Sequence, residues 1–220
     1  MNIVIYVCHV DDGILGCGGT IPQMVDAGHD VHVVYATEDY NYHPDKNNND
    51  NRQEAAEALG LLGVPHKNIH FLDFPTMKLD TTPLIDINIA FEELDLEPDV
   101  ILTLDPNDVN QDHWAAYRSA MVIGRSIDRE IGIATMEVLS SSEWGEEAFE
   151  PNFYVDISNT VERKVDALRQ IESEFEDWPH PRSAKGVRIK AQQRGMEVGH
   201  DAAEGLRLVR WFDFDEKLTH

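Results

Sequence analysis

Histidine and aspartate side chains gather in two short segments of this chain, where they could bind a metal ion. Residues 8–12 read CHVDD, and residues 105–113 read DPNDVNQDH. A zinc site built for catalysis takes three protein ligands of the histidine and carboxylate type and leaves one position open for water. Such a set is available from His9, Asp12 and His113.

Each segment on its own also has a structural interpretation. A single histidine after a strand is usually a hydrogen-bonded loop residue, and consecutive aspartates such as Asp11 and Asp12 usually form a turn or cap a helix. Together the segments favour a metal site, because both follow predicted strands of one sheet, where ligands of such folds bind. With Asp12 on the metal, Asp11 is a second carboxylate that can act on the water as a general base.

The elements that must position these segments alternate between apolar strands and amphipathic helices. The predicted strands cover residues 2–8, 31–36, 69–72, 99–104, 134–139, 153–157 and 206–212. The predicted helices lie around residues 21–27, 55–62, 83–94, 111–127, 161–171 and 183–198. The alternation predicts one α/β domain over residues 1–220, with a mostly parallel sheet covered by helices on both faces.

Two connecting segments bear on the site. Residues 38–51 (EDYNYHPDKNNNDN) are polar without periodicity, which predicts a mobile active-site loop. Residues 16–20 (GCGGT) suggest a nucleotide loop, but Ile21 stands where G-x-G-x-x-G needs its third glycine. This spacing argues against a nucleotide-binding oxidoreductase. We expect instead a glycine loop that lets the next helix start close to the metal segment, with free backbone N–H groups facing the site.

The charge balance limits the partners. The 220 residues include 18 Lys and Arg against 41 Asp and Glu, a formal net charge of −23. Nucleic acid and anionic membranes both need a basic face, so we expect neither as a partner. The two cysteines are too few for a disulfide scaffold, and no run of about 18 apolar residues occurs, so we expect neither an export signal nor a membrane span. We therefore expect a cytoplasmic protein.

The order of the short motifs carries a family resemblance. The most specific motifs are residues 9–20, HVDDGILGCGGT, and residues 110–113, NQDH. Weaker matches include Phe74-Pro75 and the HPRS of residues 180–183. In this order they resemble the PIG-L/LmbE-like de-N-acetylase family over essentially the whole chain.

The resemblance implies a Rossmann-like α/β fold and removal of an acetyl group from an N-acetylated amino sugar or glycoconjugate. It implies one zinc ion per chain and a homo-trimer or homo-hexamer. The roles that it implies are metal ligation by His9, Asp12 and His113, general base catalysis by Asp11 and substrate binding by Arg52.

The chain departs from the family pattern at two places. Gly13 and Ile14 stand where the family has a glutamate, so a carboxylate that orients a ligand is missing or comes from elsewhere. Asn110 stands where many members have a histidine; its amide can donate to an oxyanion but cannot transfer a proton. The role of general acid would then fall to Asp11 or to His180. For His180 the alternative interpretation is a surface residue beside a turn. These departures keep open a metal-containing sugar-binding protein without deacetylase activity.

Overall fold

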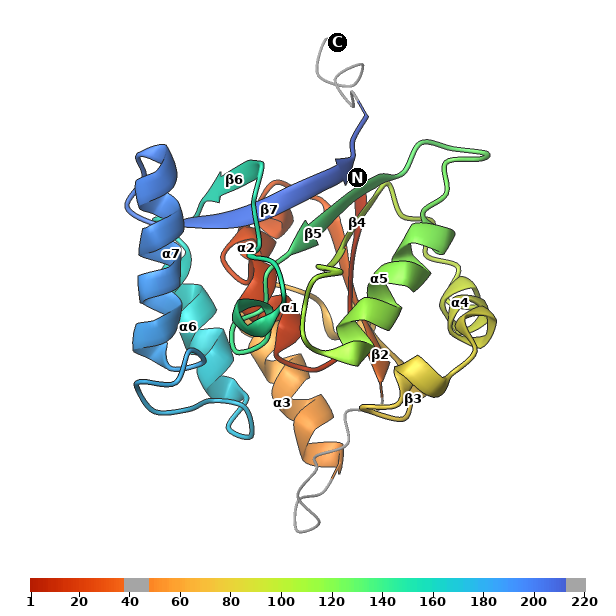
Figure 1. The fold of residues 1–220 in the computed structure, drawn as a ribbon, viewed down its shortest axis with the longest axis horizontal. Coiled ribbons are helices and arrows are strands. Elements are labelled where there is room, and N and C mark those ends of the chain that lie inside the picture. Colours follow the sequence, from red (N-terminus) through yellow and green to blue (C-terminus); the bar gives the residue numbers. More distant parts are fainter. Residues whose placement is uncertain (38–47, 213–220) are drawn as a thin grey trace.

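A seven-stranded sheet in the order β3-β2-β1-β4-β5-β7-β6 runs through the computed structural model, which describes residues 1–37 and 48–212 (Figure 1). The strands are β1 (Asn2–Val7), β2 (Asp30–Thr37), β3 (Ile69–Phe74), β4 (Val100–Leu104), β5 (Gly132–Met136), β6 (Phe153–Asp156) and β7 (Ala203–Arg210). The first five are parallel to one another, whereas β7 is antiparallel to β5 and β6. The predicted mostly parallel α/β sheet is confirmed.

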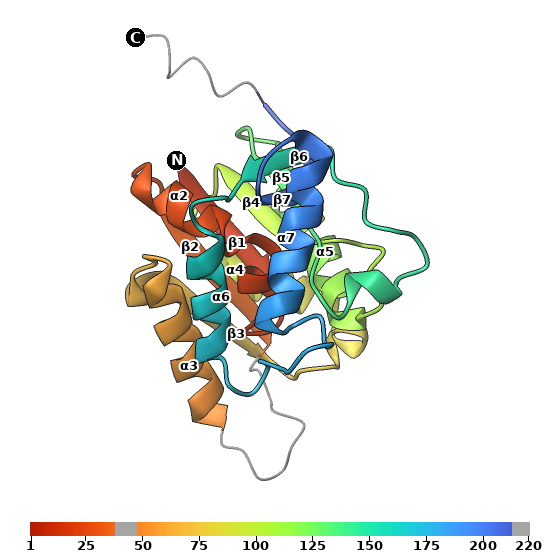
Figure 2. The ribbon, with the colours of Figure 1, turned by 90° about the vertical axis from the view of Figure 1, so that its left-hand side faces the viewer.

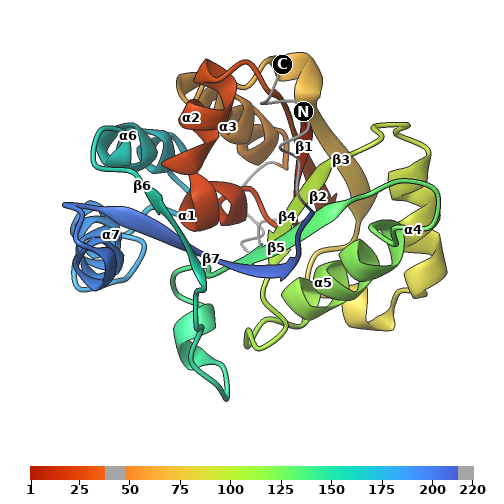
Figure 3. The ribbon, with the colours of Figure 1, turned by 90° about the horizontal axis from the view of Figure 1, so that it is seen from above.

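Helices cover both faces of the sheet, as predicted. They are α1 (Asp12–Cys17), α2 (Thr20–Asp26), α3 (Asn48–Leu61), α4 (Leu84–Glu92), α5 (Gln111–Ile123), α6 (Val161–Gln170) and α7 (Ala184–Val198). Helices α4 and α5 lie on one face, and α1, α2, α3 and α6 lie on the other (Figure 3). Helix α6 packs between α3 and α7 (Figure 2). Strands β4 and β5 are buried along their whole length, which explains why their sequences are mostly apolar.

Within the described residues, no helix is both long enough and apolar enough to cross a bilayer.

The glycine-rich segment differs from its prediction. Its first two residues, Gly16 and Cys17, form the end of helix α1 rather than a loop. A Cβ atom on Gly16 would lie 2.4 Å from Sδ of Met136, so glycine lets α1 approach β5 closely. The backbone N–H groups of Gly19 and Thr20 donate to the buried Glu204 carboxylate over 2.9 and 2.8 Å. The expectation that free N–H groups here face the site is therefore wrong.

Several element boundaries also differ from the predictions. Helix α5 ends at Ile123 instead of residue 127, because Gly124 follows as its C-cap. Strands β5 and β7 are shifted toward the N-terminus, since their antiparallel pairing, such as Met136 with Leu206, determines where each begins and ends. Of the predicted loop at 38–51, residues 38–47 lie outside the described residues, and residues 48–51 form the start of α3.

A candidate metal centre where the strand order reverses

The metal-ligand candidates lie at the carboxyl ends of β1 and β4, which are neighbours in the sheet. After β1 the chain enters α1 on one face, and after β4 it enters α5 on the opposite face (Figure 3). The two connections diverge, which is the arrangement that leaves a crevice in doubly wound sheets. His9 comes from the first connection, Asp12 is the first residue of α1, and His113 comes from the first turn of α5.

Three donor atoms converge in this crevice. Nδ1 of His9 lies 3.4 Å from Oδ2 of Asp12, and Nε2 of His113 lies 3.2 Å from Oδ1 of Asp12. The two histidine nitrogens are 3.3 Å apart, and one ligand atom from each of the three residues lies within 4.8 Å of the others. Donors bound to zinc in a tetrahedron at about 2.0–2.1 Å are about 3.3 Å from one another. The donor types and their spacing fit a zinc ion.

The second nitrogen of each histidine contacts a carboxylate. Nε2 of His9 lies 3.3 Å from Oδ2 of Asp112, and Nδ1 of His113 lies 3.1 Å from Oδ2 of Asp108. Such contacts hold the ring of a metal-binding histidine with its other nitrogen toward the ion. Asp112 is thus placed to orient His9, and Asp108 is placed to orient His113. Neither aspartate was assigned a role from the sequence, although the density of acids in DPNDVNQDH was a usable signal.

The two orienting carboxylates are themselves fixed. Asp112 accepts hydrogen bonds from the backbone N–H groups of Met77 and Leu79 over 2.6 and 3.0 Å. Met77 has a left-handed φ of 59°, a conformation that a non-glycine residue adopts at a cost. Asp108 accepts a hydrogen bond from the Ser142 hydroxyl over 2.8 Å. The loops after β3 and β5 therefore hold the groups that orient the histidines.

The carboxylates and histidines of the group stabilise one another's charges. Burial would raise the pKa of Asp12, but His113 and His9 hold it well below its usual range. Burial lowers the pKa of His113, whereas the carboxylates of Asp12 and Asp108 more than offset this and raise it to about 9. Positive charge between these side chains is thus stabilised, as a site for a metal cation requires.

Asp11 lies beside the donor group and points to a different partner. It occupies the N-cap position of α1 but makes no side-chain capping bond, so capping does not explain it. Its Oδ2 accepts a hydrogen bond from Nη1 of Arg182 over 3.1 Å. Burial and the neighbouring Asp12 raise the pKa of Asp11, and Arg182 opposes this rise. Arg182 was not assigned a role from the sequence.

A cavity of about 490 Å³ opens over these side chains. Its lining includes His9, Asp11, Asp12, Asn110, His113 and Arg182. Asn110 caps α5, because its side-chain oxygen accepts a hydrogen bond from the Asp112 N–H over 2.9 Å. Its amide nitrogen lies 3.9 Å from Sδ of Met77, which also lines the cavity. The cavity thus combines the metal-ligand candidates, the candidate base and a neutral donor.

Two predicted site residues lie outside this lining. His180 is linked to it through Arg182, whose backbone N–H donates to His180 Nδ1 over 3.2 Å. Arg52 pairs with Asp73, stacks 4.5 Å over the Phe71 ring and lines a separate hollow. The substrate-binding role of Arg52 stays a prediction.

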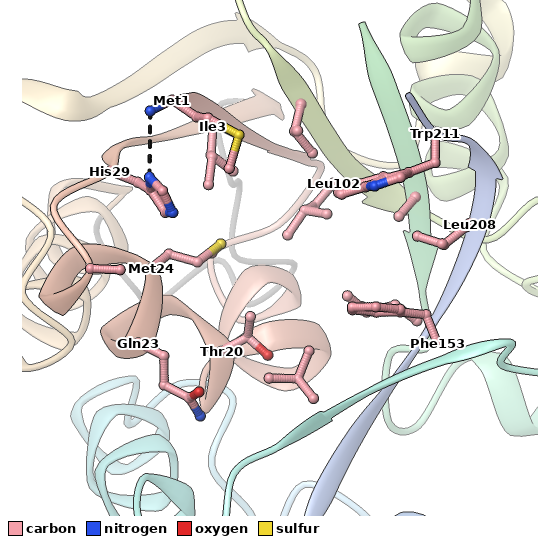
Figure 4. A pocket seen from close by; sticks show the side chains of 15 residues that line it. Met1, Ile3, Thr20, Gln23, Met24, His29, Leu102, Phe153, Leu208 and Trp211 are labelled. Carbon is pink, nitrogen blue, oxygen red and sulfur yellow. Dashed lines mark hydrogen bonds between the residues drawn. The ribbon is translucent and has the colours of Figure 1, made fainter. Parts of the chain in front are cut away.

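A second cavity, of about 270 Å³, lies far from this chemistry (Figure 4). Met1, Ile3 and Val100 line it at the amino ends of β1 and β4, opposite the metal-ligand candidates. The labelled side chains of Phe153 and Trp211 form one wall. Among the described residues its lining holds no carboxylate, so it offers no comparable metal-binding group.

The family described as PIG-L, GlcNAc-PI de-N-acetylase, matches this chain over residues 4–123. That range is more than half of the chain and contains the complete His9, Asp12 and His113 group. The chain belongs to the PIG-L family. The resemblance of the motifs is therefore confirmed, and Arg182 lies beyond the matched range of the PIG-L family.

Two curated relatives of this PIG-L family chain are deacetylases by name. Diacetylchitobiose deacetylase of Thermococcus kodakarensis is 29% identical over 91% of this chain and 80% of its own length. The uncharacterized deacetylase YaiS of Escherichia coli is 31% identical over 58% of this chain and 70% of its own length.

Solved structures with low sequence identity share the fold. N,N'-diacetylchitobiose deacetylase of Pyrococcus horikoshii has a TM-score of 0.78 at 22% identity, covering 98% of this chain and 88% of that one. The conserved protein TT1542 of Thermus thermophilus has a TM-score of 0.74 at 23% identity, covering 97% and 98%. GalB of Pseudomonas putida, a 4-carboxy-2-hydroxymuconate hydratase, has a TM-score of 0.69 at 19% identity, covering 96% and 98%. Because a hydratase shares this fold, the reaction must be argued from the site.

Proposed function

We propose that this PIG-L family protein is a zinc-dependent hydrolase that removes the acetyl group from an N-acetylated amino sugar or glycoconjugate. The observation that carries the proposal is the group of His9, Asp12 and His113 at the floor of a cavity, with a carboxylate holding each histidine. The relationship to diacetylchitobiose deacetylase supports the substrate class.

His9, Asp12 and His113 would hold the zinc ion. When bound there, zinc supplies a water of lowered pKa and polarises the amide carbonyl. Asp11 accepts the proton of the attacking water and returns it to the leaving nitrogen. A carboxyl group whose pKa is raised by burial suits both steps, because it holds a transferred proton more readily than an exposed one does.

Two further side chains complete the proposed machinery. The amide nitrogen of Asn110 donates a hydrogen bond to the oxyanion that forms when water adds to the carbonyl. His180 is the alternative general acid, and its Nδ1 accepts from the Arg182 N–H. In the neutral ring this places the remaining proton on Nε2, the atom from which it could be transferred.

The setting of the reaction follows from charge and cysteine usage. An N-acetyl sugar carries no required charge, so a protein with a net charge of −23 can bind it. The same charge disfavours nucleic acid and anionic lipid as partners. Cys8 and Cys17 are free and buried, which agrees with a cytoplasmic location. We also propose that the protein assembles as a homo-trimer or homo-hexamer.

A metal-containing sugar-binding protein without deacetylase activity is the second candidate. It is favoured by Asn110, whose amide oxygen caps α5 and whose side chain cannot transfer a proton. Because zinc and sugar binding belong to both candidates, only turnover separates them.

The test measures acetate release by zinc-loaded protein from N-acetylglucosamine, diacetylchitobiose, longer chitooligosaccharides and N-acetylated sugar-thiol conjugates. Wild-type protein should contain about one zinc per chain and release acetate from at least one of them. Asp12→Ala should lose both the zinc and the turnover. Zinc-loaded protein that binds a sugar but releases no acetate from any substrate would establish the second candidate, and a folded protein that takes up no zinc would refute both.

A further inference from the structure

Two consecutive acids, Asp11 and Asp12, are buried at the head of α1, with exposed fractions of 5% and 2%. Two buried carboxylates side by side repel each other unless each has a cationic partner. Asp12 faces His9 and His113, the other members of the metal-ligand group. Asp11 instead pairs with Arg182, which lies 171 positions away in the sequence. The fold thus divides the acids between two cationic centres.

Arg182 is held in place from its far side. The same Nη1 that donates to Asp11 also donates to the Glu174 carboxylate. Both Arg182 and Glu174 line the cavity, and the Arg182 side chain is 21% exposed. A guanidinium clamped between two carboxylates has little freedom to move, so it is a defined anchor for Asp11.

The backbone around Arg182 is equally constrained. Ser183 caps α7 by accepting a hydrogen bond from the Gly186 N–H over 3.0 Å, and its hydroxyl donates to the carbonyl of His180 over 2.7 Å. A Cβ atom on Gly186 would lie 2.3 Å from the carbonyl oxygen of Pro181, so the turn packs directly on the helix. Helix α7 therefore determines where the guanidinium lies relative to β1.

We propose that Arg182 is a positioning residue for Asp11, which it holds toward the cavity and keeps from becoming a further metal ligand. Its hydrogen bond occupies Oδ2 of Asp11 and limits rotation of the carboxylate, so that Oδ1 is left for the reacting proton. Glu174 contributes indirectly, because its carboxylate holds Arg182 in place. This inference rests on the proposed function for the role of Asp11, but the separation of Asp11 from the metal can be measured without turnover.

The test compares Arg182→Gln with Arg188→Gln, a matched control on α7 whose guanidinium pairs with the exposed Glu162. In Arg182→Gln, kcat should fall about 100-fold while KM changes less than about threefold, because a misoriented base affects the reaction step more than binding. Arg182→Lys should restore part of kcat. In an Asp11→Asn background, Arg182→Gln should lower kcat little further, since the two residues act as a unit.

Zinc affinity, measured by competition with a chelator, gives the readout that does not depend on activity. Arg182→Gln should bind zinc severalfold more tightly, because the released Asp11 can reach the ion, and Arg182→Gln with Asp11→Asn should lose that gain. Equal zinc affinity in wild type, single and double variants, or wild-type kcat in Arg182→Gln, would overturn the inference. Wild-type protein without any acetate release would instead refute the proposed function, and the zinc comparison would still decide the role of Arg182. Circular dichroism identifies any variant that fails to fold, and Arg182→Lys provides the conservative comparison.

Discussion

Nδ1 of His113, on the first turn of α5, lies 3.1 Å from Oδ2 of Asp108, on the connection that follows β4. The contact turns the opposite ring nitrogen, Nε2, toward Asp12 and His9. A carboxylate beyond the end of a strand thus orients a helical histidine into the crevice between β1 and β4.

Asp108→Asn should weaken zinc binding by about 10–100-fold, because the amide no longer supplies the charge that orients and polarises His113. Chelator competition measures this loss. The control is Asp166→Asn, which changes a 61% exposed acid paired with Arg169 and should leave the zinc affinity unchanged. Equal affinities in the two variants would show that Asp108 does not support the site.

Asp11→Asn should keep about one zinc per chain and lose orders of magnitude in acetate release, because an amide cannot accept the proton of the attacking water. Metal analysis and turnover on the same samples test this. Asp166→Asn again serves as the surface control and should retain wild-type turnover. If both variants lost activity alike, Asp11 would not be the base.

Asn110 has an observed capping role and a proposed catalytic role, and a pair of substitutions can separate them. Asn110→Ser keeps a capping oxygen and should preserve stability, whereas Asn110→Ala should lower the free energy of unfolding by about 1 kcal/mol. Both should slow turnover by about 100-fold or more if the amide nitrogen donates to the oxyanion. Thermal unfolding and steady-state kinetics measure the two effects. Full turnover in Asn110→Ser would remove the amide from the reaction.

Gly16→Ala should destabilise the protein, because its new methyl group would lie 2.4 Å from Sδ of Met136 in the core. Overpacking of this kind costs about 1–3 kcal/mol. Gly60→Ala is the matched control, since Gly60 lies on α3 with no atom within 4 Å of the added Cβ. It should raise stability by about 0.5–1 kcal/mol. Chemical denaturation compares the two, and equal effects would contradict the close packing of α1 on β5.

The ion pairs that Glu137 makes with α7 predict a pH dependence of stability. Glu137 is 10% exposed and makes a two-pronged contact with Arg194 over 2.7 and 2.9 Å. Burial raises the pKa of Glu137, but Arg194 and Lys190 outweigh it and hold the pKa below its ordinary value of 4.5. Because the folded-state pKa is lowered, this contribution to stability is complete above about pH 4.5 and is lost as the pH falls through the lowered value.

Glu137→Gln should therefore lower the free energy of unfolding by about 3 kcal/mol at pH 7, and the difference from wild type should shrink below about pH 4.5. Glu162→Gln removes the same two-pronged contact from the 62% exposed Glu162 and should cost less than about 1 kcal/mol. Urea unfolding at several pH values measures both. A difference for Glu137→Gln that does not change with pH would contradict the lowered pKa.

The sequence by itself determined the alternation of strands and helices, the mostly parallel sheet and the pairing of the CHVDD and DPNDVNQDH segments. These features depend on local periodicity and on the rule that sites lie beyond the carboxyl ends of parallel strands. For the same reason, the candidate donors His9, Asp12 and His113 were found before their geometry was known.

Only the tertiary structure decided which side chains support those donors. Asp108 and Asp112 are two of several acids in one polar run, and their pairing with different histidines depends on how α5 leaves β4. The expectation that the backbone N–H groups of GCGGT face the site was wrong, because Gly19 and Thr20 donate to Glu204, which lies far away in the sequence. Arg182 reaches Asp11 through the packing of α7 on β7. A single sequence records residue types, whereas long-range contacts arise only when the chain folds.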